Sequence, residues 1–146
     1  MRAVVQRVAK SNVTVNNRNV GSILQGLLIF LGVEKDDTEK DLDYLVNKIV
    51  HARIFQDDNK KMNLSVLDIE GEVLVISQFT LCANVKKGNR PSFNDAAEPK
   101  IAEILYNKSI KAFSRFVHTE NGVFGEMMNI ELVNSGPVTI IYDSKK

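Results

Sequence analysis

The segment from Val73 to Cys82 constrains the fold most, because it reads as one long β-strand whose apolar start gives way to polar residues. A turn signal, Glu70-Gly71, precedes it, and the run Val-Leu-Val-Ile is typical of a strand that is buried on both faces. Side chains alternate along a strand, so one face is expected to carry Leu74, Ile76, Gln78, Thr80 and Cys82. A buried amide or hydroxyl without a partner costs about 1–3 kcal/mol. These polar groups are therefore either satisfied inside the fold or part of a site.

Composition limits the class of protein. The 146 residues fit one domain, spanning residues 1–146, and a content of 44% hydrophobic and 25% charged residues is typical of a soluble globular chain. The single cysteine excludes an intrachain disulfide, and neither a signal peptide nor a membrane-spanning apolar run is evident, so we expect a cytoplasmic protein. Because the net charge of the chain is only +1, any binding of nucleic acid would have to occur at a local basic patch.

Hydrophobic periodicity and turn residues predict a mostly β chain with two main helices. Thr38 is the expected N-cap of the first helix, and Asn16-Asn17 and Asn121-Gly122 are expected turns. Regular β-α-β alternation is absent, so the predicted fold class is α/β of the α+β type rather than a doubly wound sheet. Strands are expected at 2–8, 12–15, 18–23, 27–33, 64–69, 73–82, 128–133 and 138–142, and helices at 38–54 and 99–117.

The loop at residues 83–94 is the clearest basic segment. It carries Lys86, Lys87 and Arg90 and no acidic residue up to Asn94, and it leaves the strand that holds Gln78. One interpretation is an ordinary solvated loop. The other is a contact to nucleic-acid phosphates, with Phe93 available to stack on a base.

Other catalytic or metal-binding patterns are weak. The two histidines, His51 and His118, lack metal-ligand spacing, so neither a metal nor a cofactor is expected. No phosphate-binding glycine motif and no Gly-x-Ser-x-Gly sequence is present. A pair of Cys82 with a histidine is conceivable as nucleophile and base, but a small buried core thiol explains Cys82 more simply.

Two short motifs together resemble the signature pair of the D-aminoacyl-tRNA deacylases. They are Ser77-Gln78-Phe79-Thr80-Leu81 and Asn134-Ser135-Gly136-Pro137-Val138-Thr139. Each alone would be a weak signal, but further segments in the same order are similar to that family. These are Val5–Val8, Lys61–Ser65, Lys87–Phe93, Phe124-Gly125 with Met127-Met128, and Tyr142–Lys145.

The resemblance implies a fold, a reaction and a set of partners. It implies a homodimer of compact, β-rich, barrel-like subunits that hydrolyses the ester joining a D-amino acid to the 3′ end of tRNA, without a cofactor and away from membranes. In that family the Gly-Pro peptide is cis and enters the active site of the partner subunit. The sequence alone would not have indicated this for Gly136–Pro137, because only about 5–6% of X–Pro bonds in folded proteins are cis.

The resemblance also implies roles for individual residues. Backbone carbonyls of Gly136 and Pro137 would accept hydrogen bonds from the α-ammonium, and the main chain beside them would exclude an L side chain but admit glycine. A plain type VI turn is the alternative at this position. Arg7, Asn134 and Ser135 are the expected supports of the Gly-Pro segment, and Lys86, Lys87 and Arg90 the expected tRNA contacts.

Catalysis is assigned by the same resemblance to Ser77, Gln78, Phe79 and Thr80. In one hypothesis Thr80 is the nucleophile, although no base is evident for it. In the preferred one, the 2′-hydroxyl of the terminal ribose assists water, while backbone N–H groups near Phe79 and Thr80, with Gln78, stabilise the oxyanion. Two other classes remain: a nucleic-acid-binding module without activity, and a hydrolase of small esters.

Overall fold

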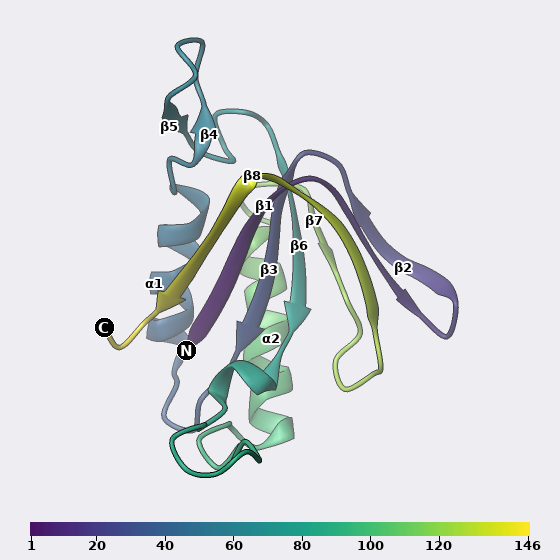
Figure 1. Cartoon of the computed structure of the whole chain (residues 1–146), viewed down its shortest axis with the longest axis vertical. Helices are drawn as coiled ribbons and strands as arrows, with labels where there is room; N and C mark the ends of the chain where they lie inside the picture. The colour runs from purple at the N-terminus through teal and green to yellow at the C-terminus, as the bar shows by residue number, and fades with distance from the viewer.

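The computed structural model describes all 146 residues as a mixed sheet with two helices. The sheet has six strands in the order β2-β1-β3-β6-β7, and β8 pairs with the other edge of β1 (Figure 1). Its strands are β1 (Arg2–Val15), β2 (Arg18–Ile23), β3 (Gly26–Gly32), β6 (Glu72–Ser77), β7 (Thr119–Asn121) and β8 (Asn129–Asp143). The other elements are α1 (Glu39–Val50), α2 (Pro99–Phe113), the hairpin of β4 (Phe55–Gln56) with β5 (Met62–Leu64), and the 3-10 helix η1 (Phe79–Cys82).

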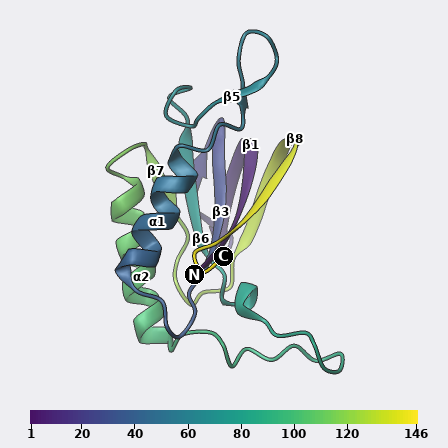
Figure 2. The same cartoon turned by 90° about the vertical axis from the view of Figure 1, so that its left-hand side faces the viewer.

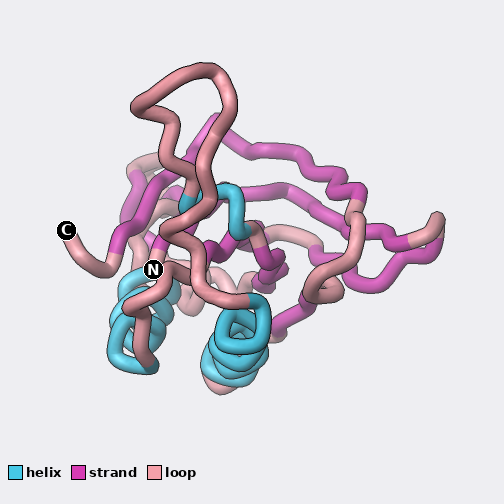
Figure 3. Tube along the Cα trace, turned by 90° about the horizontal axis from the view of Figure 1, so that it is seen from below, coloured by secondary structure: helices cyan, strands magenta, loops and turns pink.

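Strand β1 organises the sheet because it pairs with three other strands. Its residues 2–8 pair with β3 and its residues 11–15 with β2, while β8 follows its opposite edge from residue 2 to residue 14, all antiparallel. Strands β3, β6 and β7 are parallel to one another, connected through α1 and α2. The sheet curls until it nearly closes into a barrel, and both helices lie side by side against one face (Figures 2 and 3). The predicted fold class is thus confirmed, and the sheet is not doubly wound.

The core explains why β3 and β6 read as continuous apolar runs. A cluster of 22 buried residues fills the space between the sheet and the helices, and six more lie on the opposite face of the sheet. Leu27 and Ile29 belong to the first cluster, and Leu28 and Leu74 to the second, so both faces of these strands are buried. Burying such a side chain stabilises the fold by about 1.5–3 kcal/mol.

The strand predicted at 73–82 ends earlier than expected. Strand β6 stops at Ser77, and residues 79–82 form η1, so Gln78, Thr80 and Cys82 do not continue its face. The neighbouring strand β3 ends at Gly32, and the hydrogen bond from Gln78 N–H to Leu31 C=O closes the ladder. The chain then turns across Gly32, where an added Cβ would lie 3.0 Å from the Gln78 carbonyl oxygen and from Leu81 Cβ.

Other predicted boundaries also need correction. The helices end at Val50 and Phe113, not at 54 and 117, and the strands predicted at 2–8 and 12–15 form one strand because β8 pairs along both. The strand predicted at 64–69 ends at Leu64, and residues 66–70 form turns, where the Asp68 carboxylate accepts hydrogen bonds from the backbone and hydroxyl of Ser65. Strand β5 pairs with β4. Asn121 ends β7 rather than forming a turn.

Thr38 is the N-cap of α1, as predicted. Neither helix is long and apolar enough to cross a membrane.

Candidate active site

The segment from Ser77 to Thr80 lies where β6 ends and η1 begins. The Gln78 side-chain amide donates a hydrogen bond to the Thr80 hydroxyl at 2.5 Å, and Phe79 is 59% exposed. The first N–H groups of a helix have no partner within it, so those of Phe79 and Thr80 are not used inside η1. The partner of the Thr80 hydroxyl is an amide, which cannot act as a base.

A largely apolar pocket of about 570 Å³ opens beside this segment. Tyr106 forms one wall, and its hydroxyl contacts the carbonyl oxygens of Val75 and Gly122 at 2.9 and 3.0 Å. Burial raises the pKa of Tyr106, and its hydroxyl is already engaged by these two carbonyl oxygens. The pocket is lined by Leu31, Val33, Ile76, Ser77, Gln78, Phe79, Ala96, Ala97, Pro99, Ala102, Tyr106, Phe124, Gly125, Glu126, Met127, Met128 and Ile130.

The second motif forms an exposed bulge in β8. Gln6 pairs with Thr139 and Val8 with Asn134, so Arg7 alone stands opposite residues 135–138. The Gly136–Pro137 peptide bond is cis, Gly136 has φ of +145°, and both residues are exposed.

Two side chains hold this bulge in shape. The Asn134 side-chain oxygen accepts a hydrogen bond from Val138 N–H at 2.8 Å, and its amide nitrogen donates to the Val138 carbonyl at 3.2 Å. Arg7 is buried, and it donates from Nε to the Ser135 carbonyl at 2.7 Å and from Nη1 to the Ile54 carbonyl. The Gly-Pro segment therefore presents fixed main-chain groups to solvent.

The two motifs lie at different ends of the sheet in one chain. Arg7 pairs with Leu27 and Ser77 with Leu31, so the two are offset by four positions along β3, roughly 13 Å at about 3.3 Å per residue. In Figure 1, η1 is at the bottom, whereas β8 bends over the top of the sheet. The structure brings Ser77, Gln78, Phe79 and Thr80 together, and separately Arg7, Asn134, Ser135, Gly136 and Pro137.

The basic loop is connected to the first motif. Asn84 and Ser92 pair across its base through N–H to C=O hydrogen bonds of 2.7 and 3.0 Å. The rings of Phe79 and Phe93 meet edge to face, with centroids 5.1 Å apart. The loop projects from the sheet (Figure 2), and its cations Lys86, Lys87 and Arg90 are all exposed.

Cys82, the last residue of η1, is buried and does not line the pocket. Its thiol contacts the Val33 carbonyl at 3.4 Å, and burial raises its pKa to about 11. Such a thiol is a core group rather than a nucleophile. No group of three or more His, Cys, Asp or Glu side chains is arranged to hold a metal ion.

The apolar pocket beside Gln78 was not predicted from the sequence. Its walls come from α2 and from residues 124–130, far from the motif in the chain. The only signal was the similarity of Phe124-Gly125 and Met127-Met128 to the family, which gave no indication that they lie beside Gln78.

Known proteins resemble this chain over nearly its whole length. Residues 4–143 match the family model described as D-Tyr-tRNA(Tyr) deacylase. A D-aminoacyl-tRNA deacylase of Sulfurihydrogenibium sp. (strain YO3AOP1) is 56% identical over 146 residues, covering 100% of this chain and 99% of the relative. One of Aquifex aeolicus (strain VF5) is 57% identical over 147 residues, with the same coverage.

Solved structures match as well. That of a c-Myc DNA Unwinding Element Binding Protein superposes with a TM-score of 0.93 at 38% identity, covering 98% of both chains. A probable eukaryotic D-amino acid tRNA deacylase, at 18% identity and TM-score 0.82 over 97% of both chains, has the same fold. Since the family model and the curated relatives span nearly all of it, the chain belongs to the D-Tyr-tRNA(Tyr) deacylase family.

Proposed function

We propose that this chain, as one domain of residues 1–146, hydrolyses the ester between a D-amino acid and the 3′ end of tRNA, as a cytoplasmic homodimer that proofreads translation. The class of reaction follows from the family, whose curated members are D-aminoacyl-tRNA deacylases and thus hydrolases of ester bonds. The observation that carries the site is the separation of roughly 13 Å between Arg7 and Ser77 along β3. A two-fold axis would bring the Gly-Pro bulge of one copy to the Ser77–Thr80 segment of the other.

Main-chain groups select the chirality in this proposal. An enzyme that accepts many D-amino acids cannot read the side chain, so it must read the groups on the α-carbon. The exposed bulge at Gly136 and Pro137 offers carbonyls for the α-ammonium. With the α-carbon held against it, we expect its backbone to exclude an L side chain. Gly136 has no Cβ, so the ligand can approach the main chain closely.

The substrate supplies part of the catalytic apparatus. Thr80 has an amide as its hydrogen-bond partner, which favours water assisted by the ribose 2′-hydroxyl over a threonine nucleophile. The free N–H groups at the start of η1, with Gln78, are positioned to stabilise the oxyanion that forms on the ester carbonyl.

In this proposal the apolar pocket binds the terminal base of the tRNA, and the basic loop binds its phosphates. The pocket beside Gln78 is large enough for a nucleoside and offers Tyr106 and Phe124 as apolar walls for the terminal base. The basic loop packs on the catalytic segment through the rings of Phe93 and Phe79. Its exposed cations, Lys86, Lys87 and Arg90, are suited to bind the phosphates of the acceptor end.

The test is a set of time courses with D-tyrosyl-, L-tyrosyl- and glycyl-tRNA, each with a no-enzyme control. We expect rapid loss of the D-ester, protection of the L-ester, and loss of the glycyl ester because glycine has no side chain to exclude. Equal loss of the D- and L-esters would indicate a general esterase. Resistance of glycyl-tRNA would mean that exclusion of L side chains is not the whole basis of selection.

A binding protein without activity is the second candidate. The similarity to a DNA unwinding element binding protein, at 38% identity, favours it. It predicts that nucleic acid is retained while neither ester is cleaved. The same assay with free D-tyrosine esters tests a small-ester hydrolase, which would act equally well without tRNA.

A further inference from the structure

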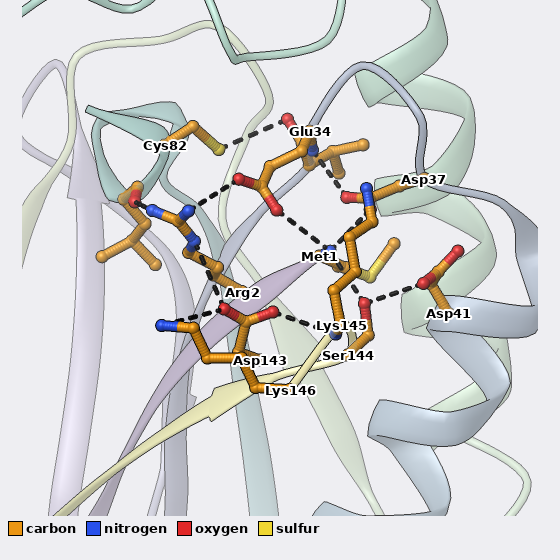
Figure 4. Close-up of polar contacts among 12 residues, drawn as sticks. Met1, Arg2, Glu34, Asp37, Asp41, Cys82, Asp143, Ser144, Lys145 and Lys146 are labelled. Atoms are coloured by element: carbon orange, nitrogen blue, oxygen red, sulfur yellow. Dashed lines mark hydrogen bonds and ion pairs between the residues drawn. The ribbon is translucent and has the colours of Figure 1, made fainter. Parts of the chain in front are cut away.

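Arg2 lies at the start of β1 and reaches the helix that carries the proposed catalytic segment. Its Nη1 donates a hydrogen bond to the Leu81 carbonyl at 3.1 Å (Figure 4). Leu81 is the third residue of η1, directly after Phe79 and Thr80. This hydrogen bond thus connects the proposed site to a residue that lies 79 positions away in the chain.

Two carboxylates hold the Arg2 guanidinium in place. Its Nη2 lies 2.9 Å from Glu34 Oε1, and its Nε lies 3.8 Å from Asp143 Oδ2. Glu34 is itself mostly buried, and its carboxylate also lies 3.4 Å from the Met1 ammonium. That ammonium in turn pairs with the buried Asp37 (Figure 4). Glu34 and Asp143 therefore orient the planar Arg2 guanidinium that donates to the Leu81 carbonyl.

Few hydrogen bonds tie η1 to the rest of the chain. It is four residues long, and its own turns are closed by bonds from Leu81 N–H to Gln78 C=O at 3.2 Å and from Ala83 N–H to Thr80 C=O at 3.1 Å. Gln78 N–H joins the start of η1 to Leu31 of β3, and the Cys82 thiol joins its end to Val33, just after β3. The last carbonyls of a helix lack partners within it, and Arg2 supplies one to Leu81.

We propose that Arg2 is a positioning residue for the deacylation reaction. Through Leu81 it sets the direction of the first N–H groups of η1, the proposed oxyanion donors. This rests on the function proposed above. Arg2 touches no reacting atom, so it should influence the transition state more than the binding of the tRNA.

The test compares Arg2→Gln with the control Arg18→Gln, which removes the same charge from an exposed residue of β2. Because a misplacement of about 1 Å can cost on the order of 100-fold in rate, we expect kcat of R2Q to fall by about 10- to 100-fold with KM for D-tyrosyl-tRNA unchanged. Arg2→Lys keeps the charge but has a single donor nitrogen in place of the two that contact Glu34 and Leu81, so it should recover only part of kcat. The R18Q control should match the unmodified protein.

Amide NMR spectra give a reading that does not depend on activity. In R2Q the Phe79 and Thr80 amide resonances should move, and the Leu81 and Ala83 amides should exchange faster, while signals from β2 stay in place. A wild-type kcat in R2Q, or unmoved Phe79 and Thr80 amides, would overturn the proposal. If the unmodified protein cleaves no D-ester, the proposed function fails, and the NMR comparison alone decides whether Arg2 positions η1.

Discussion

Thr80 combines an exposed position with a poor environment for a nucleophile. Its hydroxyl is paired with the Gln78 amide, which cannot take its proton. We therefore expect Thr80→Ala to keep its single-turnover rate on D-tyrosyl-tRNA to within about 10-fold, the order expected for a group that is not the nucleophile.

Quenched-flow measurements of the first turnover provide the check. Folding of the variant is verified by its thermal unfolding curve. A fall of several orders of magnitude in a well-folded variant would restore the nucleophile model, and an acyl-enzyme trapped on Thr80 of the unmodified protein would prove it.

Gly136 adopts a backbone conformation that L residues rarely occupy. Its φ is +145°, and an added Cβ would lie 2.8 Å from Arg7 Nη2 and 2.9 Å from Val138 Cγ2. We expect Gly136→Ala to lower the free energy of unfolding by about 1–3 kcal/mol and to displace the bulge, with a large loss of D-specific activity.

Urea unfolding of Gly136→Ala beside Gly88→Ala checks this expectation. Gly88 also has a positive φ, +64°, but an added Cβ there would meet no atom within 4 Å. Equal stability losses in the two variants would mean that the contacts with Arg7 and Val138 contribute nothing.

At the scale of elements, α1 illustrates a pH-dependent cap. The Asp41 carboxylate accepts hydrogen bonds from the Thr38 backbone and from the Thr38 and Ser144 hydroxyls. Partial burial alone would raise the pKa of Asp41, but these bonds outweigh it and lower the pKa from 3.8 to about 2. The stabilisation is therefore present above pH about 4 and is lost as the pH falls towards 2.

Unfolding by urea between pH 5 and pH 2 should reveal this in a comparison with Asp41→Asn. The unmodified protein should be the more stable at pH 5, and its advantage should shrink as Asp41 becomes protonated. A difference in stability that stays constant over this range would contradict the assignment.

The basic loop should account for much of the salt dependence of tRNA binding. Replacing Lys86, Lys87 and Arg90 by Gln should reduce the slope of log K against log salt by up to about 3, because each lost phosphate contact removes about one unit. The control replaces Lys40, Lys100 and Lys111, three exposed helical lysines, with the same change in charge. An unchanged slope for the loop variant would place the tRNA on another surface.

The elements that the sequence predicted well are those whose own residues decide them. The buried strands β3 and β6 follow from their apolar runs, and the N-cap of α1 follows from Thr38 and the acidic first turn. The end of β6 was predicted wrongly because it depends on where β3 stops, which is a tertiary property. Likewise residues 134–137 read as a turn, yet β8 continues because β1 pairs with it on both sides of the bulge.

The site was predictable to a different degree. The two motifs were identified by resemblance, and the structure shows that they form two separate groups. Neither the apolar pocket nor Arg2 could have been predicted, because their partners lie far away in the chain: Tyr106 and Phe124 around Gln78, and Leu81 beside Arg2. Such contacts carry no local pattern.

At the scale of the molecule, the distance between the motifs makes a prediction about mixed dimers. Strand β8 also leaves one edge unpaired and exposes Ile141 and Val133, which suits burial by a second copy. If each site combines both motifs from different chains, Gly136→Ala mixed with a variant disabled at Gln78 should recover activity. Random assortment in a two-fold dimer gives about a quarter of the unmodified rate.

The mixture is measured after dissociation and reassociation of the two variants, with each variant alone as control. Light scattering verifies that dimers have reformed. No recovery in a mixture that contains dimers would mean that each site is built from a single chain.

The pairing of β1 has a consequence for synthesis on the ribosome. Residues 2–14 are among the first made, but they complete their hydrogen bonds only with β8, which extends to residue 143. At about 5–20 residues per second, β1 waits on the order of 6–26 seconds for its last partner. During that interval an apolar strand is exposed at one edge, so the nascent chain is expected to bind chaperones, and folding is expected to finish only after β8 has left the exit tunnel.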